Sequence, residues 1–312
     1  MHSVERPQVE LCEGSGSAHC SEFRIGGVSV RVAGQNNDDV TLVPSLEPFR
    51  AETLASDITI QVEWTRTLGP GAGRQLFDSG SLWRLYEDGT EFRFDFSAPI
   101  LGTQPYKRLL VDSQFRRARL QMSSECFVAK GYAVAPLEYP LDELLIMHRL
   151  TQEKAIELHS CGIVRADGTG NLFVGHSGAG KSTTTRLWTA YEDVEVLSDD
   201  RIIVRRETPE SPGRVRMYGT PWHGEAAYAS PGSALLARIF ILEHGKGNVL
   251  TRLPASQAVA ELFARSFVPF HRHDYVDSAL DFLHELVGAV PCYHYAFEPN
   301  ETAVGRILEF RD

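Results

Sequence analysis

The segment from residue 175 to residue 182 constrains this chain more than any other, because it reads Gly-His-Ser-Gly-Ala-Gly-Lys-Ser. It matches the Walker A pattern Gly-x-x-x-x-Gly-Lys-Ser/Thr in full, with an apolar strand candidate before it and a helix candidate after it. Closely spaced glycines let successive amide hydrogens point at phosphate oxygens, and the N-terminus of the following helix adds positive potential. The alternative is a glycine turn that only caps a helix. The full match with both flanks favours a phosphate-binding loop (P-loop).

The polar side chains of this loop have distinct expected roles. We expect Lys181 to reach the β- and γ-phosphates of a nucleoside triphosphate, Ser182 to offer its hydroxyl to magnesium, and Thr183 to donate a further hydrogen bond to phosphate. The predicted cofactors are therefore ATP and Mg²⁺. The residues expected to bind them through the loop are Gly175, His176, Ser177, Gly178, Ala179, Gly180, Lys181, Ser182 and Thr183.

Two adjacent carboxylates, Asp199 and Asp200, follow the loop after a single helix candidate and end the strand-like run from Val194. Open α/β sheets place ligand chemistry at the carboxyl ends of their strands. One carboxylate can hold magnesium while the other accepts a proton from an attacking hydroxyl. The alternative is a solvated Asp-Asp turn. The position one helix after a phosphate loop favours the functional interpretation.

This order of loop, helix, strand and Asp-Asp resembles the HPr kinase/phosphorylase group, which shares its nucleotide-binding core with phosphoenolpyruvate carboxykinases. In both, a Gly-x-Ser-Gly-x-Gly-Lys-Ser/Thr loop precedes Asp-Asp by one helix, and a histidine upstream of the loop is matched here by His159. The resemblance covers residues 140 to 230 and, more loosely, the rest of the C-terminal half. It implies Asp199 as catalytic base, His159 as its electrostatic and hydrogen-bonding neighbour, and Asp200 as a magnesium-side carboxylate. Taken alone, His159 is more often an ordinary partly buried histidine.

The chain also departs from the bacterial HPr kinases. It lacks their Glu-Arg-Gly signature after the second carboxylate strand, and the stretch from Val215 to Glu225 carries Gly-Thr-Pro-Trp instead. This segment resembles kinase-related proteins of unknown substrate that share only the core, and it argues against HPr as the acceptor. Glu225, as a third metal-side residue, and His223 could approach the phosphates, although polar loop residues of this kind are more often structural.

Composition and charge exclude several classes of function. The 312 residues carry a net charge of -10 and a sequence pI of about 5.6, so there is no excess positive charge to bind a nucleic acid. No stretch approaches the ~18 apolar residues of a membrane span, and the N-terminus has no signal-peptide core. The five cysteines are scattered and form no Cys-x-x-Cys pair. A cytoplasmic protein without a nucleic-acid or membrane partner is expected.

The hydrophobic period divides the chain into three parts. Residues 1–22 lack periodicity and are predicted to be a flexible tail, residues 23–138 to be β-rich and mostly antiparallel, and residues 139–312 to be the P-loop domain. The clearest hairpin turns at Asp88-Gly89, whose residues suit positive φ angles. The predicted fold class is α/β, or α+β overall, in which the β-rich region joins a phosphoenolpyruvate carboxykinase/HPr-kinase-like domain with a mixed sheet and flanking helices.

Elements of the second region follow from the same periods. A helix should begin near Pro140, at its first position. Further helices are expected over 182–188, 256–267 and 279–287, and strands over 155–164, 172–174, 194–200, 235–242 and 292–297. The run from His271 to Asp274 has too few ligands for a confident metal site and is equally a substrate-contacting loop, while Arg265 and Arg272 could supply positive charge near a phosphoryl group.

These observations together predict a kinase, that is, a Mg-ATP-dependent phosphotransferase of the HPr-kinase-like class. Its acceptor would be a hydroxyl of a protein serine or of a small metabolite, chosen or positioned by the β-rich half. One alternative is a nucleotide-regulated binding module that transfers no phosphate. Another is a phosphoenolpyruvate carboxykinase-like enzyme, although the chain is short for that family and has no evident arginine cluster for a carboxylate. The resembled enzymes form oligomers, which leaves self-association of this chain as an open expectation.

Overall fold

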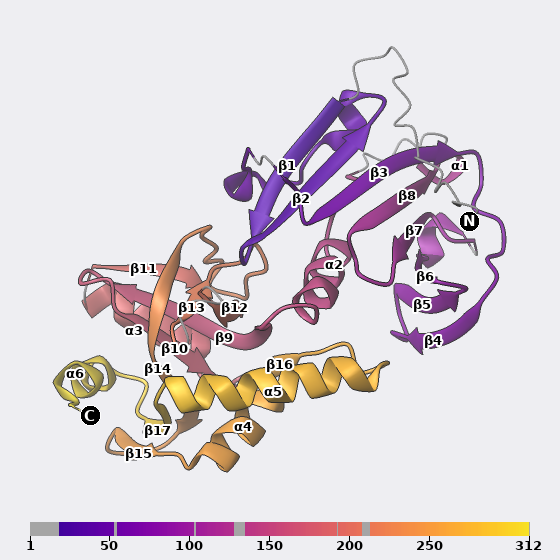
Figure 1. Cartoon of the computed structure of the whole chain (residues 1–312). Helices are drawn as coiled ribbons and strands as arrows, with labels where there is room; N and C mark the ends of the chain where they lie inside the picture. The colour runs from indigo at the N-terminus through magenta and orange to yellow at the C-terminus, as the bar shows by residue number, and fades with distance from the viewer. Residues whose placement is uncertain are drawn as a thin grey trace, which may run out of the picture.

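The computed structural model describes residues 19–311, except 53–54, 103, 128–134, 192 and 208–212. Over these residues the protein is a strand-rich mixture of α and β structure, with two mixed sheets and six α-helices (Figure 1). None of the described helices has the length and apolar character needed to cross a membrane. Most of the predicted tail, residues 1–18, lies outside the described residues. Its last four residues, 19–22, belong to a strand, so ordered structure begins earlier than predicted.

The first sheet is built from the N-terminal region and has the strand order β1-β2-β3-β8-β7-β6-β5-β4. Neighbouring strands are antiparallel except for β2 with β3 and β3 with β8, so the prediction of a mostly antiparallel sheet is confirmed. Its elements are β1 (His19–Ile25), β2 (Val28–Gly34), η1 (Asn37–Val40), η2 (Glu47–Phe49), β3 (Ile58–Thr65), β4 (Arg74–Asp78), β5 (Trp83–Asp88), β6 (Glu91–Phe96), η3 (Pro99–Leu101), β7 (Lys107–Asp112) and β8 (Arg117–Ser123).

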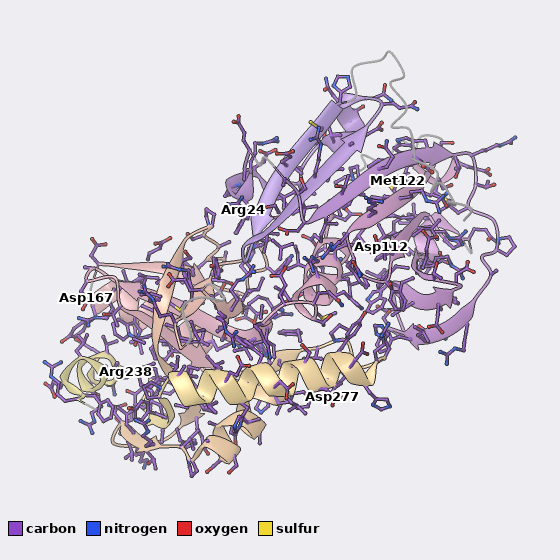
Figure 2. All side chains as sticks on the ribbon, viewed as in Figure 1. Arg24, Asp112, Met122, Asp167, Arg238 and Asp277 are labelled. Carbon is purple, nitrogen blue, oxygen red and sulfur yellow. The ribbon has the colours of Figure 1, made fainter. Side chains whose placement is uncertain are left out.

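Local turn chemistry explains the connections of this sheet. The predicted β5–β6 hairpin turns at Gly89, which has a φ of +65°. Asp112 lies at the end of β7 (Figure 2). Its carboxylate accepts backbone N–H bonds from Gln114, Arg116 and Arg117, which stabilises the turn between β7 and β8.

The second region contains the remaining elements and a nine-stranded sheet whose main path is β10-β9-β12-β13-β14-β17-β15, with β11 and β16 also paired to β9. Helix α1 (Ser124–Phe127) follows β8 and precedes this region. The helices of the second region are α2 (Leu141–Leu150), α3 (Lys181–Tyr191), α4 (Ala255–Phe263), α5 (His273–Ala289) and α6 (Thr302–Glu309). Its strands are β9 (Ala155–Arg165), β10 (Gly170–Val174), β11 (Val194–Ser198), β12 (Arg201–Arg206), β13 (Val215–Tyr218), β14 (Ser233–His244), β15 (Val249–Arg252), β16 (Ser266–Phe267) and β17 (Cys292–Phe297).

Two long strands, β9 and β14, each change partners along their length. The first half of β9 pairs with β12 and β16, and its second half pairs with β10 and β11. Strand β14 likewise pairs with β13 at its start and with β10 and β17 further on. His159 lies opposite Arg201 on β12, whereas the next residue, Ser160, lies opposite Val174 on β10. The change of partner therefore brings the end of β10 and the start of β12 together beside His159.

The two regions share a hydrophobic core where α2 lies between them (Figure 1). The ring of His148 on α2 stacks on Phe115 of the first region at a centroid distance of 4.6 Å and lies 5.3 Å from His271. Burial lowers the pKa of His148 to about 3 and that of His271 to about 4, so both rings are neutral at neutral pH. They behave as aromatic packing groups, and the metal interpretation of the His271 run gains no support from this environment.

Most predicted elements of the second region agree with the structure, and several differ in their bounds. The strand predicted over 194–200 ends at Ser198, so Asp199 and Asp200 follow it, and the helix predicted over 279–287 already begins at His273. Pro140 is the residue before α2 and caps it, instead of occupying the first helical position. Helix α4 ends at Phe263, and Ser266–Phe267 then form β16, because the backbone of this segment pairs with β9. A helical period in the sequence cannot reveal this strand pairing, which depends on residues about a hundred positions away in the chain.

Candidate functional site

The predicted phosphate-binding loop connects β10 to α3 and needs its glycines. Gly178 and Gly180 have φ angles of +80° and +102°, which residues other than glycine rarely adopt. A Cβ atom at Gly180 would also lie 2.4 Å from the Cζ atom of Phe297. Strand β10 ends directly before the loop, and helix α3 begins at Lys181 near its end, as the sequence predicts.

Neighbouring strands hold this loop from both sides. The backbone N–H of Gly175 donates to the carbonyl of His159 at 3.2 Å, and the Nε2 atom of His244 lies 2.8 Å from the carbonyl oxygen of Gly178. Inside the loop, the N–H of Ala179 donates to the carbonyl of His176 at 3.1 Å. The loop is therefore a fixed, preorganised structure.

Lys181 is folded against the loop and almost fully buried. Its Nζ atom donates to the carbonyls of Gly175 at 3.0 Å and His176 at 3.2 Å, and it lies 2.8 Å from Nε2 of His159. Burial lowers the pKa of the Lys181 ammonium, while the nearby carboxylate of Asp200, 3.9 Å away, opposes this effect. The lysine side chain therefore links the loop to His159 and to Asp200.

Asp200 is the carboxylate of the Asp-Asp pair that lies among the charged groups of the site. Its Oδ1 atom is 2.9 Å from Nε2 of His159, and its Oδ2 atom pairs with Nη1 of Arg201. Burial raises the pKa of Asp200, but the His159 hydrogen bond and the positive charges of Arg201 and Lys181 lower it by more, so the net shift is downward. Asp200 is consequently ionised at neutral pH, and its side chain keeps 24% of its surface exposed.

Asp199, by contrast, does not occupy the place expected of a catalytic base. Its side chain is buried, with 1% of the residue exposed. Oδ1 accepts N–H bonds from Gly224 at 2.9 Å and Tyr228 at 3.3 Å, and Oδ2 accepts one from Ala226 at 2.9 Å. The predicted contact between His159 and Asp199 is likewise replaced by one with Asp200. The physical reason is that the chain turns sharply after β11, so the first carboxylate points inward.

Arg201 is a residue of this site that the sequence reasoning missed. Its Nε atom lies 2.9 Å from Glu143 of α2 and 3.5 Å from Glu157 of β9, and its guanidinium stacks on Phe267 at 4.1 Å. Glu157 is fully buried, and this burial raises its pKa well above the usual value. The sequence signal for both was a charged residue inside an apolar strand, in Arg-Ile-Ile-Val and Ala-Ile-Glu-Leu.

The segment with Gly-Thr-Pro-Trp forms a loop, residues 219–228, which is held by buried side chains. The hydroxyl of Thr220 donates to the carbonyl of Arg201 at 2.7 Å, and that of Ser198 donates to the carbonyl of Trp222 at 3.1 Å. The indole N–H of Trp222 donates to Asp142 at 3.0 Å. Gly219 has no room for a side chain, since a Cβ atom there would lie 2.0 Å from the carbonyl oxygen of Ser230.

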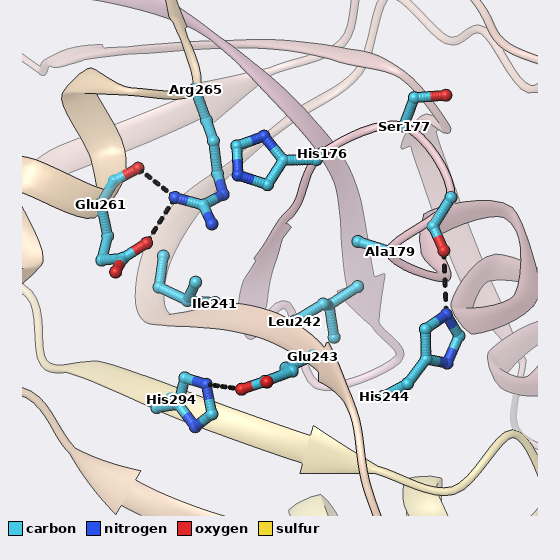
Figure 3. Close-up of a pocket in the computed structure, with 11 residues that line it drawn as sticks. His176, Ser177, Ala179, Ile241, Leu242, Glu243, His244, Glu261, Arg265 and His294 are labelled. Atoms are coloured by element: carbon cyan, nitrogen blue, oxygen red, sulfur yellow. Dashed lines mark hydrogen bonds and ion pairs between the residues drawn. The ribbon is translucent and has the colours of Figure 1, made fainter.

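Three cavities border these residues. The first has a volume of about 460 Å³ and lies beside the loop, where Arg265 is paired with Glu261 and His294 with Glu243 (Figure 3). The second, about 380 Å³, is lined by both loops and by His159, Lys181 and Asp200. The third, about 370 Å³, is lined by Asp200 and Arg201 among others. Ser177, Gly178 and His244 line both the first and the second cavity, while Asp200 lines both the second and the third.

The residues predicted to bind ATP gather around the first two cavities. His176 and Ala179 line the first, and Gly180, Lys181, Ser182 and Thr183 line the second. Gly175 lines neither, but its carbonyl accepts a hydrogen bond from Lys181. Of the two arginines considered for phosphoryl binding, Arg265 lines the first cavity, whereas Arg272 is paired with Asp274 at 2.7 Å.

The three predicted metal-side residues, Ser182, Asp200 and Glu225, all line the second cavity. Within the described part of the chain no group of three or more His, Cys, Asp or Glu side chains is arranged to hold a metal ion. The hydroxyl of Ser182 and the carboxylate of Glu225 nevertheless suit Mg²⁺ even without Asp200, because this ion commonly keeps several waters and takes further oxygen ligands from substrate phosphates. The donor set therefore fits a magnesium ion that arrives with a nucleotide.

A scan of the chain against models of protein families finds no matching family, and a search of curated proteins finds no match either.

Proposed function

We propose that this protein is a Mg-ATP-dependent kinase of the HPr-kinase-like class that transfers the γ-phosphoryl group to a hydroxyl. One observation carries the proposal: Asp200, whose carboxylate is ionised, lines both the cavity bordered by the Walker A loop and a separate third cavity. An acceptor hydroxyl in the third cavity can thereby face a phosphoryl group in the second.

The nucleotide would extend through the two cavities that share Ser177, Gly178 and His244. The triphosphate fits the second cavity, where the loop amides and the start of α3 supply positive potential. The base and ribose fit the first cavity, whose volume of about 460 Å³ lies in the range of small-molecule sites. To contact the β- and γ-phosphates, Lys181 would exchange at least one of its present partners, the carbonyls of Gly175 and His176, for a phosphate oxygen.

In the proposed transfer, Asp200 accepts the proton of the acceptor hydroxyl as the oxygen attacks the γ-phosphorus. The bond from phosphorus to the acceptor oxygen forms, the bond to the β-phosphate bridging oxygen breaks, and ADP leaves. His159 and Arg201 hold the Asp200 carboxylate in place, at 2.9 Å in the case of His159. Ser182 and Glu225 would hold Mg²⁺, which neutralises the charge that develops on the phosphates. Asp199 shapes the loop at 219–228 and does not take part in the proton transfer.

The electrostatics of the third cavity argue against the carboxykinase alternative. An enzyme of that kind must grip a carboxylate substrate, and the one arginine among the described residues of this cavity, Arg201, is already paired with Glu143 and Asp200. A kinase acting on an alcohol requires no such free arginine.

The decisive experiment compares Asp200→Asn with wild type in ATP affinity and in acceptor-dependent ADP release. Removing a general base typically costs 10²- to 10⁴-fold in rate, so we expect a loss of roughly that size in turnover, with ATP affinity kept within a few-fold. Asp281→Asn, an exposed position on α5, is the matched control and should leave both unchanged. Tight ATP binding without turnover on any acceptor, in wild type and variant alike, would instead favour the nucleotide-sensing module.

A further inference from the structure

The third cavity lies where the N-terminal region meets the second region. Ser45 comes from the N-terminal region, and Tyr139 and Asp142 come from the segment that enters α2. Pro221, Trp222 and His223 come from the loop at 219–228, while Arg201 and Asp200, which also lines the second cavity, complete the lining. Elements far apart in the sequence thus converge on one cavity of about 370 Å³ next to the proposed base.

The charges around this cavity do not suit an anionic ligand. Its charged lining residues within the described chain are Asp142, Asp200 and Arg201, together with the titratable His223. The Arg201 guanidinium pairs with Asp200 and with Glu143 of α2, so its positive charge is compensated. A carboxylate or phosphate placed there would meet more negative than positive charge. No free cation would offset the free-energy cost of removing that anion from water.

The polar and aromatic groups of the cavity instead match a molecule with several hydroxyl groups. Hydroxyls of Ser45 and Tyr139 can both donate and accept, the carboxylate of Asp200 accepts, and His223 offers ring nitrogens. Trp222 and Tyr139 add aromatic surface for C–H groups. A cavity of this volume that mixes aromatic surface with a few convergent polar groups is typical of small-molecule sites.

We propose that the phosphoryl acceptor is a small polyhydroxylated compound that carries no anionic group, such as a neutral sugar or cyclic polyol, and that it binds in the third cavity. This inference rests on the proposed kinase function and narrows its acceptor. One hydroxyl of the compound gives its proton to Asp200 and takes the γ-phosphoryl group of ATP, so the products are ADP and a neutral compound turned into a phosphate monoester. Ser45, from the N-terminal region, and Tyr139, at the start of the second region, select the acceptor.

Tyr139 offers the cleanest test of this assignment, because 61% of its surface is exposed and its removal should not unfold the protein. ADP release would be measured with Mg-ATP and D-glucose, D-ribose, myo-inositol or glycerol, beside glucose 6-phosphate, D-gluconate, D-glycerate and a serine-containing peptide. We expect turnover with at least one neutral compound and, for that compound, a roughly three- to tenfold higher KM in Tyr139→Ala with an unchanged KM for ATP. Tyr191→Ala, at a 50% exposed tyrosine that does not line the cavity, should leave both values unchanged.

The possible outcomes separate this inference from the kinase proposal. Turnover confined to the anionic compounds or to the peptide, or an acceptor KM that Tyr139→Ala does not change, would overturn the inference and leave the kinase standing. If no compound gives turnover, saturation-transfer NMR with the same neutral compounds decides. Binding of one of them that Tyr139→Ala weakens and Tyr191→Ala does not would support the cavity assignment even though transfer had failed. An absence of binding by all of them would overturn it.

Discussion

Two loops line the second cavity, and they are held in different ways. The loop at 175–182 owes most of its shape to its own backbone, with positive φ angles at Gly178 and Gly180 and an internal bond from Ala179 to His176, and contacts to His159 and His244 add to this. The loop at 219–228 is instead held by side chains outside it, chiefly the carboxylate of Asp199. A loop of the first kind can be identified from a short motif, whereas the second kind depends on contacts that are distant in the sequence.

The largest expected effect comes from breaking the locally encoded loop with Gly180→Ala. The new Cβ would lie 2.4 Å from Phe297 at a φ of +102°, and backbone strain of this kind costs on the order of 1–3 kcal/mol before any steric clash is added. We expect ATP affinity, measured by calorimetry, to fall by roughly 100-fold or more. Gly168→Ala is the matched control, because its φ of +81° is equally unusual but no atom lies within 4 Å of the new Cβ. An unchanged affinity in Gly180→Ala would show that the loop does not bind phosphate in this conformation.

The second loop should respond most strongly to Asp199→Asn. Asparagine keeps one acceptor oxygen but turns an N–H group toward a backbone donor, so part of the contact to Gly224, Ala226 and Tyr228 is lost. Hydrogen bonds to a charged group contribute about 1.5–3 kcal/mol each, and we expect urea unfolding to show a loss of about 2–3 kcal/mol. Asp200→Asn should cost less than about 1 kcal/mol, because this carboxylate is partly exposed. Equal losses in the two variants would contradict the distinction between a structural and a reactive aspartate.

A smaller effect is expected from Thr220→Val, which removes one hydroxyl from the support of the same loop. The bond to the carbonyl of Arg201 at 2.7 Å would be lost inside a fully buried site, at a cost of about 1–2 kcal/mol in unfolding free energy. Because the valine is nearly isosteric, the loop should remain folded, and ATP affinity should change little. The control is Thr169→Val, in the turn between β9 and β10. A large fall in ATP affinity for Thr220→Val would mean that the two loops are coupled more tightly than their separate supports indicate.

The same contrast explains which parts of the protein the sequence could predict. The loop at 175–182 and its flanking strand and helix lie where the sequence predicts them, because glycine spacing and local periodicity determine them. The hairpin at Asp88-Gly89 follows from a local pattern as well, and so do five of the nine strands of the second sheet, β9, β10, β11, β14 and β17. Strand β16 could not be predicted from the sequence, because it exists only through its pairing with β9.

The roles of the two aspartates show where sequence reasoning stops. Asp199 and Asp200 are adjacent and chemically identical, and only the sharp turn after β11 decides which carboxylate is buried under the loop at 219–228. The alternation of a strand pattern predicts that the two side chains point in opposite directions, but it does not predict which of them points toward the cavity. Arg201 and Glu143 were missed for a related reason, because the ion pair between them joins β12 to α2 across 58 positions.

The smallest expected effect tests the one direct connection between the loop at 175–182 and the Asp-Asp turn, the pair formed by Lys181 and Asp200. Burial lowers the pKa of Lys181, and the Asp200 carboxylate at 3.9 Å partly offsets this, so Asp200→Asn should lower that pKa further. Phosphate binding favours the charged ammonium, so ATP affinity should fall as the pH rises through the pKa of Lys181, and in the variant this fall should begin at a lower pH. The quantity to compare is the ratio of the Kd for ATP in Asp200→Asn to the Kd in wild type. We expect this ratio to be roughly two- to fivefold larger at pH 9 than at pH 7, a size typical of a partly screened ion pair. Calorimetry at both pH values measures this ratio, with Asp281→Asn as the control. A ratio that is the same at pH 7 and pH 9 would mean that Lys181 stays fully charged without Asp200, and that the two parts of the site are electrostatically independent.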